Sequence, residues 1–374
     1  MSPIAKRVVV IASFAESLIL FRGPLLRRMA GAGHDVLALA PASEPVAREL
    51  AAMGIQFEAI PLDRTGLNPA RDLGLVLGLV RRLRRHGPDC VLSYTIKPVV
   101  YGSIASAICR VPMVALMITG LGFAFTEGGG GRRRLARWIA QALYGVALRF
   151  ADVVFFQNPD DRDDFARRGL TGPGKVVMIN GSGVDLDHYA ERPLPDQVGF
   201  LMIARLVRDK GVIEYVEAAR ILRREFPWVR CVLAGWLDSN PSAVGAAQVE
   251  AWCREGVIDY VGPLADVRPT ISGCSVYVLP SYREGTPRTV LEAMAMGRAI
   301  VTTDVPGCRE TIVDGESGFL VSPRDPEALA EAMSRFLRDP ALARRMGADA
   351  RRRVEQVYDV HKVNEVVMDA LGLQ

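Results

Sequence analysis

Short apolar segments alternate with longer amphipathic segments through the first half of the chain. The short segments are mostly continuous and rich in Val and Ile, which is typical of parallel strands buried on both faces. The intervening segments, such as 24–32, 45–53 and 72–85, have the apolar spacing of helices. This alternation predicts a doubly wound α/β sheet. The strands expected in it are residues 8–12, 36–40, 57–60, 90–94, 113–116 and 153–157.

The same alternation starts again after ERPLPDQ at 191–197, a segment with two prolines that we interpret as a linker. We therefore expect two Rossmann-like domains, residues 1–190 and 191–357. The apolar spacing of residues 358–374 predicts a C-terminal helix that could pack on either domain, including back on the first. The second domain is expected to contain strands at 198–203, 229–234, 257–261, 276–279 and 299–303, with helices at 212–226 and 287–296.

The composition is that of a globular protein. The 374 residues are 49% hydrophobic and 24% charged, which excludes an intrinsically disordered chain. No apolar stretch approaches the roughly 20 residues of a membrane-spanning helix, and the apolar run near the N-terminus is too short for a signal peptide. We therefore expect a cytoplasmic protein. The six cysteines and four histidines show no metal-binding spacing, so we expect buried free thiols and no metal site.

The segment 281–297 carries the densest chemical signal. Thr286 is a favourable N-cap, Pro287 suits the first position of a helix, and Gly297 suits its end. The predicted helix therefore begins where a parallel strand ends. The free N–H groups and the positive end of such a helix favour a phosphate or another anion.

Two carboxylates, Glu284 and Glu292, flank this helix start. Because carboxylates repel a phosphate, we expect them to accept hydrogen bonds from hydroxyl groups, one from a sugar and the other from a ribose diol. With the phosphate site between the two carboxylates, the expected ligand has a sugar, a diphosphate and a ribose in a line, which is the order in a sugar nucleotide. The residues expected to bind this donor are Gly285, Thr286, Pro287, Val290 and Glu292.

A second cluster, ARLVRDKG at 204–211, follows the first strand of the second domain. Arg205 and Lys210 in this turn are suited to clamp a diphosphate, the guanidinium with two hydrogen bonds and the ammonium as a point charge. With backbone amides they would stabilise the charge on the departing phosphate. We therefore assign Glu284, Arg205 and Lys210 to catalysis. We expect no metal and no cofactor, since the nucleotide-sugar is a substrate.

The spacing of Glu284 and Glu292 resembles the E-x7-E motif of family 4 retaining glycosyltransferases. The segments AIVTTDVPG at 299–307 and DGESGFLV at 314–321 are similar to that family as well. The resemblance implies the GT-B fold, in which two Rossmann-like domains face a central cleft. It implies that the first glutamate contacts the donor sugar, the second the ribose, and the Arg and Lys named above the diphosphate. It also implies retention of anomeric configuration by front-face attack, with no protein nucleophile.

Four segments of the first domain are SYTIKP at 93–98, ITGLGF at 118–123, QNPDD at 157–161 and NGSGVD at 180–185. They resemble bacterial transferases that add N-acetylhexosamines or related sugars to polyprenyl-diphosphate-linked saccharides. The resemblance implies a lipid-linked acceptor, a role in surface polysaccharide or glycoprotein assembly, and a UDP-sugar donor. Many members of the family carry a histidine near the loop at 94–97, where this chain has none, so no catalytic base is assigned.

The segment ESLILFRG at 16–23 follows the first predicted strand, where a dinucleotide-binding domain would carry a glycine-rich turn. The missing GxGxxG pattern argues against a dinucleotide site. We expect this segment to be a loop that reaches the cleft. Its basic residue and Lys97 are candidates for the acceptor diphosphate. The expected acceptor-binding residues are Ser17, Arg22, Gly23, Lys97 and Thr119.

Basic residues are concentrated in the first half of the chain. Residues 1–195 carry 24 basic and 17 acidic side chains, and the remainder carries 22 and 25. Arginines beside apolar and aromatic residues suit a membrane interface, so we expect a peripheral protein on the inner face of the cytoplasmic membrane. No nucleic acid is expected, because no nucleic-acid-binding motif is present. The two arginine clusters are Arg81, Arg82, Arg84 and Arg85, and Arg132, Arg133, Arg134 and Arg137.

Three other functions fit parts of the pattern. The same transferase could use a soluble acceptor, in which case the arginines would not bind membranes. A sugar-nucleotide 2-epimerase shares the two-domain fold, but it should have histidines and carboxylates in its cleft. A non-catalytic sugar-nucleotide-binding module would not need Glu284, Arg205 and Lys210 together.

Overall fold

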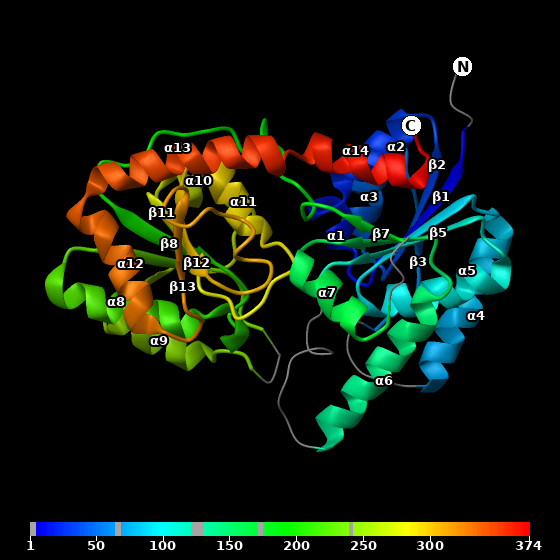
Figure 1. The fold of residues 1–374 in the computed structure, drawn as a ribbon, viewed down its shortest axis with the longest axis horizontal. Helices are drawn as coiled ribbons and strands as arrows, with labels where there is room; N and C mark the ends of the chain where they lie inside the picture. The colour runs from blue at the N-terminus through cyan, green and yellow to red at the C-terminus, as the bar shows by residue number, and fades with distance from the viewer. Residues whose placement is uncertain (1–4, 64–68, 121–130, 171–174, 239–241) are drawn as a thin grey trace. The chain divides into compact units, whose positions relative to one another are not determined.

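The chain folds into two compact units, Met1–Ser182 together with His361–Gln374, and Gly183–Val360 (Figure 1). Each unit is built on a parallel sheet that carries helices, which confirms the predicted pair of Rossmann-like α/β domains. The computed structural model describes residues 5–63, 69–120, 131–170, 175–238 and 242–374.

The first unit has a doubly wound sheet. Its described residues form seven parallel strands in the order β3-β2-β1-β4-β5-β6-β7. The chain runs outward in opposite directions from the neighbours β1 and β4, and loops at such a point commonly bind ligands. The strands are β1 (Arg7–Ile11), β2 (Asp35–Ala40), β3 (Gln56–Ala59), β4 (Cys90–Tyr94), β5 (Met113–Ile118), β6 (Val153–Phe156) and β7 (Val176–Met178). The helices are α1 (Glu16–Leu20), α2 (Gly23–Gly31), α3 (Glu44–Ala52), α4 (Pro69–His86), η1 (Pro98–Gly102), α5 (Ser103–Cys109), α6 (Gly131–Leu148), α7 (Pro159–Arg167) and α14 (Val360–Leu371).

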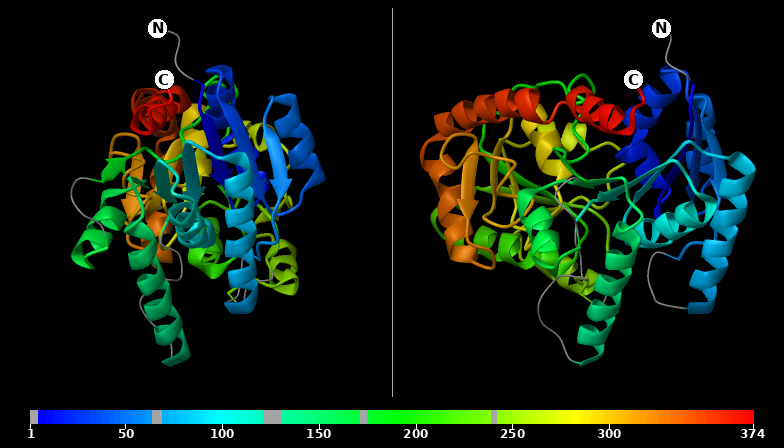
Figure 2. Two further views of the ribbon diagram at one scale, coloured as in Figure 1. Left: turned by 90° about the vertical axis from the view of Figure 1, so that its right-hand side faces the viewer. Right: turned by 45° about the vertical axis from the view of Figure 1, so that its right-hand side comes forward.

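Alternate residues of β1 supply opposite faces of this sheet, as the two-residue period of a strand requires. Val8 and Val10 pack in a cluster with α2, α3 and α14. Val9 and Ile11 pack in another cluster with α4, α5 and α6. Both faces are covered, which explains why the strands are continuously apolar. Figure 2 shows α4 and α6 on the same side of the sheet.

The second unit repeats this arrangement. Its described residues form six parallel strands in the order β10-β9-β8-β11-β12-β13. One continuous apolar cluster joins the strands to the helices on both faces. The strands are β8 (Gly199–Ile203), β9 (Arg230–Ala234), β10 (Asp259–Tyr260), β11 (Val276–Leu279), β12 (Ala299–Thr303) and β13 (Gly318–Val321). The helices are η3 (Arg208–Lys210), α8 (Val212–Glu225), α9 (Ala246–Arg254), α10 (Arg268–Ser272), α11 (Arg288–Ala295), α12 (Pro326–Arg338) and α13 (Pro340–Val357).

The chain leaves the first unit between Ser182 and Gly183, earlier than the linker expected at 191–197. The prolines mark an irregular segment of the second unit instead. The fully buried Arg298 donates hydrogen bonds to the carbonyl oxygens of Arg192 (2.6 Å) and Pro193 (2.9 Å) and holds this segment in place. The chain returns to the first unit after Val360, so α14 packs on the first sheet.

Two short edge strands, β7 and β13, were not expected from the sequence. β13 begins with Gly318, where a β-carbon would lie 1.9 Å from the carbonyl oxygen of Ile300 on β12. A glycine is therefore needed for the close approach of the two strands, although glycine normally argues against a strand. None of the helices in the described ranges combines the length and the apolar character that a bilayer span requires.

Candidate functional site

Two sequence-predicted residues that are far apart in the chain meet in the second unit. Glu284 lies in the loop after β11, and Lys210 ends η3 after β8, the strand next to β11 in the sheet. Lys210 Nζ donates a hydrogen bond to Glu284 Oε1 and forms an ion pair with it, and Ser281 Oγ donates to the same oxygen over 2.7 Å. The side chains of Lys210 and Glu284 are 23% and 12% exposed, so water screens the pair only in part. The structure therefore joins the two predicted motifs at one point.

Arg205, the third residue assigned to catalysis, follows β8 directly. Its Nη1 lies 3.1 Å from Asp238 Oδ2, in an ion pair whose side chains are 37% and 17% exposed. Asp238 comes from the loop after β9, the other neighbour of β8. Sequence reasoning missed Asp238 because no motif surrounds it. The only available signal was that Arg205 and Asp238 each follow the carboxyl end of a strand, and that β8 and β9 are neighbours.

The helix after Glu284 starts one residue later than predicted. Pro287 is its N-cap, not its first residue, and α11 begins at Arg288. The pyrrolidine ring fixes φ but leaves ψ free, and the ψ of 107° keeps Pro287 outside the helix. Thr286 is therefore not the cap. The side chain of Val290, a predicted donor-binding residue, lies in the apolar core of the unit.

Close packing fixes the loop that contains Glu284 and Gly285. Gly307 has φ of +83°, and a β-carbon on it would lie 2.3 Å from the carbonyl oxygen of Glu284 and 2.6 Å from that of Gly285. The N–H of Glu284 donates to the carbonyl oxygen of Pro306 over 3.0 Å. The segment at 299–307 therefore supports the loop from behind.

Glu292 lies on α11 and is 5% exposed. Tyr189 Oη and Arg288 Nε each donate a hydrogen bond to its Oε1 over 2.8 Å. Burial raises the pKa of Glu292, while the charge of Arg288 and the two hydrogen bonds oppose that rise. Tyr189 was not singled out in the sequence, since a tyrosine in an irregular segment carries no pattern.

The segment at 16–23 of the first unit is not the expected loop. It forms α1 and the turn into α2, which begins at the buried Gly23. Ser17 is buried, and its Oγ forms a 2.9 Å hydrogen bond with Tyr94 Oη. The guanidinium of the buried Arg22 lies over the ring of Tyr94, 5.5 Å from its centroid. Leu18 is fully buried in the core of the first unit and Ile19 packs against that core, which fixes the segment as a short helix although Leu20 stays exposed.

Lys97 also lies in the first unit, just beyond β4. Its Nζ is 3.1 Å from Asp72 Oδ1 of α4, and the two side chains are 13% and 12% exposed. Thr95, two residues earlier, has φ of +70°, a conformation that is strained for a β-branched residue and often occurs at functional sites. Ser13, after β1, hydrogen-bonds Thr95 over 2.7 Å. Thr119 follows β5 and is half-buried.

These contacts give each unit its own group of candidate residues at the carboxyl ends of its central strands. In the first unit these are β1, β4 and β5, and in the second β8 and β11. This is the usual position of ligand sites in doubly wound sheets. Among the described residues, no three His, Cys, Asp or Glu side chains are grouped so as to hold a metal ion.

Comparison with known proteins assigns this arrangement to a family. Residues 188–353 match the group 1 glycosyl transferases, and residues 23–181 match the glycosyl transferase 4-like domain. The α-maltose-1-phosphate synthase of Mycolicibacterium smegmatis is 30% identical over 268 residues, which are 64% of this chain and 67% of that protein. The chain belongs to the group 1 glycosyltransferases.

Another relative of this glycosyltransferase matches over nearly the whole chain. It is the N,N′-diacetylbacillosaminyl-diphospho-undecaprenol α-1,3-N-acetylgalactosaminyltransferase of Campylobacter jejuni, 28% identical over 92% of this chain and 93% of that protein. The solved structure of Anabaena HepE in complex with UDP has a TM-score of 0.78, with 20% identity over 99% of this chain and 100% of that one. The structural likeness confirms the GT-B fold.

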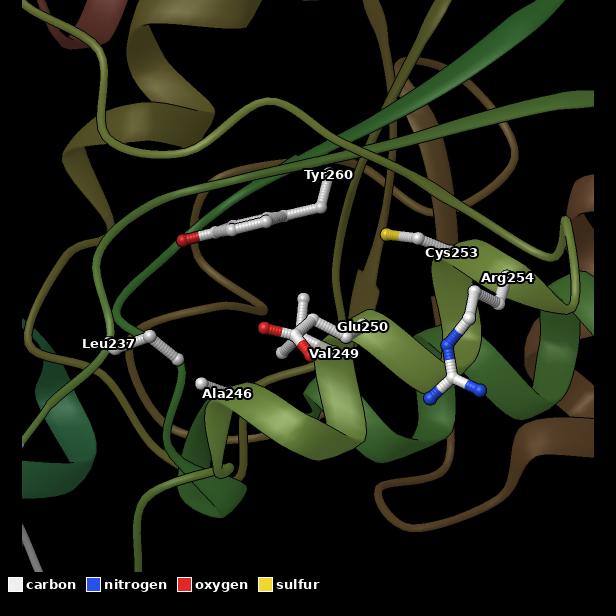
Figure 3. Close-up of a pocket in the computed structure, with 7 residues that line it drawn as sticks. All are labelled: Leu237, Ala246, Val249, Glu250, Cys253, Arg254 and Tyr260. Carbon is white, nitrogen blue, oxygen red and sulfur yellow. The ribbon is translucent and has the colours of Figure 1, made fainter.

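A pocket in the second unit of the glycosyltransferase contains none of the predicted site residues (Figure 3). It has a volume of about 420 Å³ and lies between α9 and the ring of Tyr260. Leu237, the residue before Asp238, forms part of its wall. Cys253 also lines it and is exposed, which corrects the expectation that the cysteines are all buried.

The arginines of the first cluster divide into two pairs. Arg82 Nε lies 3.2 Å from Glu58, and Arg85 also pairs with Glu58. Arg81 and Arg84 are exposed on α4. The second cluster, at 132–137, lies in α6, but its side chains fall outside the described part of the structure.

Proposed function

We propose that this glycosyltransferase moves an N-acetylhexosamine or a related sugar from a UDP-sugar to a polyprenyl-diphosphate-linked saccharide. The anomeric configuration is retained, no metal takes part, and the product enters a surface glycan or a glycoprotein glycan. The contact between Lys210 and Glu284 carries the proposal, because it places a cation for the diphosphate beside a carboxylate for the sugar. The activity for which the Campylobacter relative is named supports the lipid-linked acceptor and the N-acetylhexosamine.

The second unit supplies the residues for the donor. Arg205 and Lys210 bind the diphosphate and stabilise its charge as the glycosidic bond breaks. Glu284 accepts hydrogen bonds from the donor sugar, and Glu292 accepts them from the ribose. Gly285, Thr286 and Pro287 line the path between the two carboxylates, and Val290 supports the helix start from below, because its side chain is buried in the apolar core.

The first unit supplies the residues for the acceptor. Lys97 is held by Asp72, and Arg22 is held over Tyr94, so both cations have fixed positions. They bind the acceptor diphosphate, while Ser17, Gly23 and Thr119 shape the surrounding surface. Acting on a lipid-linked acceptor requires the protein to work peripherally on the inner face of the cytoplasmic membrane.

The test is a comparison of variants in nucleotide binding and sugar transfer. Thermal stabilisation by UDP, GDP and ADP, with and without chelator, identifies the nucleotide, and we expect UDP to stabilise the protein equally in both conditions. Glu284→Gln should abolish transfer to a polyprenyl-diphosphate-linked saccharide while the protein stays folded. Lys210→Ala should weaken UDP binding. The matched controls are Glu327→Gln and Lys175→Ala, since both side chains are exposed.

Each outcome selects one function. Near-normal turnover by both site variants would refute the site assignment. Stabilisation by no nucleotide would favour a non-catalytic module, and transfer to water-soluble saccharides alone would favour a soluble acceptor. Conversion of the donor sugar without any acceptor would identify an epimerase.

A further inference from the structure

The two oxygens of the Glu292 carboxylate have different surroundings. Tyr189 and Arg288 both donate to Oε1. Among the described residues, no side chain or N–H donates a hydrogen bond to Oε2. The side chain keeps 7% of its surface exposed. One oxygen is therefore occupied by protein donors, and the other is not.

This asymmetry matters because Glu292 is buried. A buried carboxylate with an unfilled oxygen is costly unless a partner supplies the missing hydrogen bonds. Burial also raises its pKa, and a protonated carboxyl would offer a donor where an acceptor is needed. The hydrogen bonds from Arg288 and Tyr189 favour the ionised form and fix the rotation of the carboxylate plane.

Tyr189 is itself held in position from several sides. The ring of His188 packs edge-on against it, with centroids 4.8 Å apart. Arg268 donates to the carbonyl oxygen of His188 over 3.4 Å while it pairs with Asp266. Arg351 donates to the carbonyl oxygen of Tyr189 over 3.3 Å. These contacts hold the backbone at 188–189 and one edge of the phenol ring, and the hydroxyl donates its hydrogen bond to Glu292.

We propose that Tyr189 and Arg288 are positioning residues that keep Glu292 ionised and present its Oε2 to the ribose diol of the donor. This inference rests on the proposed function, which assigns Glu292 to the ribose. Its consequence is a preference for ribonucleoside over 2′-deoxyribonucleoside diphosphates that depends on the Tyr189 hydroxyl. Tyr189 acts through Glu292 and does not touch the reacting atoms.

The experiment measures the affinity of the full-length protein for UDP and for 2′-deoxy-UDP by calorimetry. We expect the natural protein to prefer UDP roughly tenfold or more, since a site built to bind a hydroxyl rejects the analogue without it. Tyr189→Phe should reduce this preference to about threefold or less, as expected when a hydrogen bond to a charged group is lost. Arg288→Gln should act in the same direction.

Tyr215→Phe is the matched control. It removes another buried hydroxyl of the same unit, which donates to the carbonyl oxygen of Val232 and not to a site residue. It should lower the melting temperature and leave the preference for UDP unchanged.

The pH dependence of UDP binding separates positioning from simple stabilisation. Removing the Tyr189 hydroxyl takes away a hydrogen bond to the ionised form, so the pKa of Glu292 rises further. UDP affinity falls as pH decreases and Glu292 takes up a proton. In Tyr189→Phe this fall should begin at a higher pH than in the natural protein, and in Tyr215→Phe at the same pH.

The possible failures are distinguishable. If the natural protein binds neither UDP nor 2′-deoxy-UDP, the proposed function itself is wrong. If it binds both equally, Glu292 does not bind the 2′-hydroxyl of the ribose. This inference then fails, while the proposed function stands. A full preference for UDP in Tyr189→Phe, with an unchanged pH midpoint, would also overturn it.

Discussion

At the scale of single residues, the charges of the candidate site are paired with one another. Lys210 pairs with Glu284, and Arg205 pairs with Asp238. If these cations bind the donor diphosphate as proposed, each must exchange a carboxylate for a phosphate. Such an exchange keeps the buried charges paired in both states, because leaving a cation alone in a partly buried site would be costly.

The Lys210 pair leads to a prediction about binding of UDP without a sugar. Glu284→Gln removes the competing charge, so Lys210 is free to bind phosphate. We expect UDP affinity to rise roughly fivefold, which corresponds to about 1 kcal/mol for a partly screened ion pair. The measurement is calorimetric titration with UDP.

The comparison variant is Glu292→Gln, which should bind UDP more weakly because it loses a charged acceptor for the ribose. If Glu284→Gln weakened UDP binding as much as Glu292→Gln does, Glu284 and Lys210 would not compete in the proposed way.

At the scale of elements, the short loop between β11 and α11 holds Glu284 in the proposed donor site. Its backbone packs against Gly307 so closely that any side chain there would push it away. The positive φ of Gly307 adds strain for any other residue. The loop position therefore depends on a residue 23 positions away from Glu284 in the sequence.

Gly307→Ala should accordingly reduce transfer far more than it reduces stability. We expect a decrease of roughly 100-fold or more in kcat/KM, as for a displacement of about 1 Å in a catalytic group. Gly315→Ala is a suitable control, since Gly315 also has positive φ, but a β-carbon there would meet no atom within 4 Å. Equal losses of transfer in both variants would show that backbone strain alone, and not loop displacement, is responsible.

The elements also show how far the sequence could predict the structure. The central strands were predicted because continuous runs such as 90–94 and 276–279 have an unmistakable apolar pattern. Lys210 and Glu284 were found because each belongs to a motif. Tyr189 and Asp238 were missed because their roles arise only from contacts between distant segments. Polar contacts between distant segments produce no periodic pattern of apolar residues, so the sequence does not reveal them.

At the scale of the whole molecule, exposed apolar and basic side chains bear on the proposed membrane contact. Leu73 and Leu77 on α4 are each 61% exposed, and Trp138 on α6 is 65% exposed. Arg81 lies four residues after Leu77, and Arg84 lies three residues after Arg81. At these spacings both arginines share the helix face of Leu73 and Leu77. Exposed apolar side chains beside exposed basic side chains suit binding to an anionic membrane surface.

We therefore predict that the double variant Arg81→Gln, Arg84→Gln loses binding to vesicles that contain anionic phospholipid. Partitioning should fall roughly 10- to 30-fold, since each arginine near an anionic surface contributes about 1 kcal/mol. Flotation with such vesicles measures it. Arg82→Gln, Arg85→Gln is the control with the same change in charge, and it should have a smaller effect because these arginines pair with Glu58. Unchanged flotation of the first variant would show that α4 does not contact the membrane through these arginines.

The return of the chain to the first unit has a consequence for synthesis. The last helix, α14, supplies Val367, Met368 and Leu371 to the core of the first unit. His34 and Lys6 hold the segment that follows it, through the carbonyl oxygens of Leu373 (3.1 Å) and Gly372 (2.8 Å). On the ribosome, the part of the protein that is translated first must therefore wait for the final residues before its core is complete. The second unit is a continuous insertion and can finish folding while the first still lacks a helix.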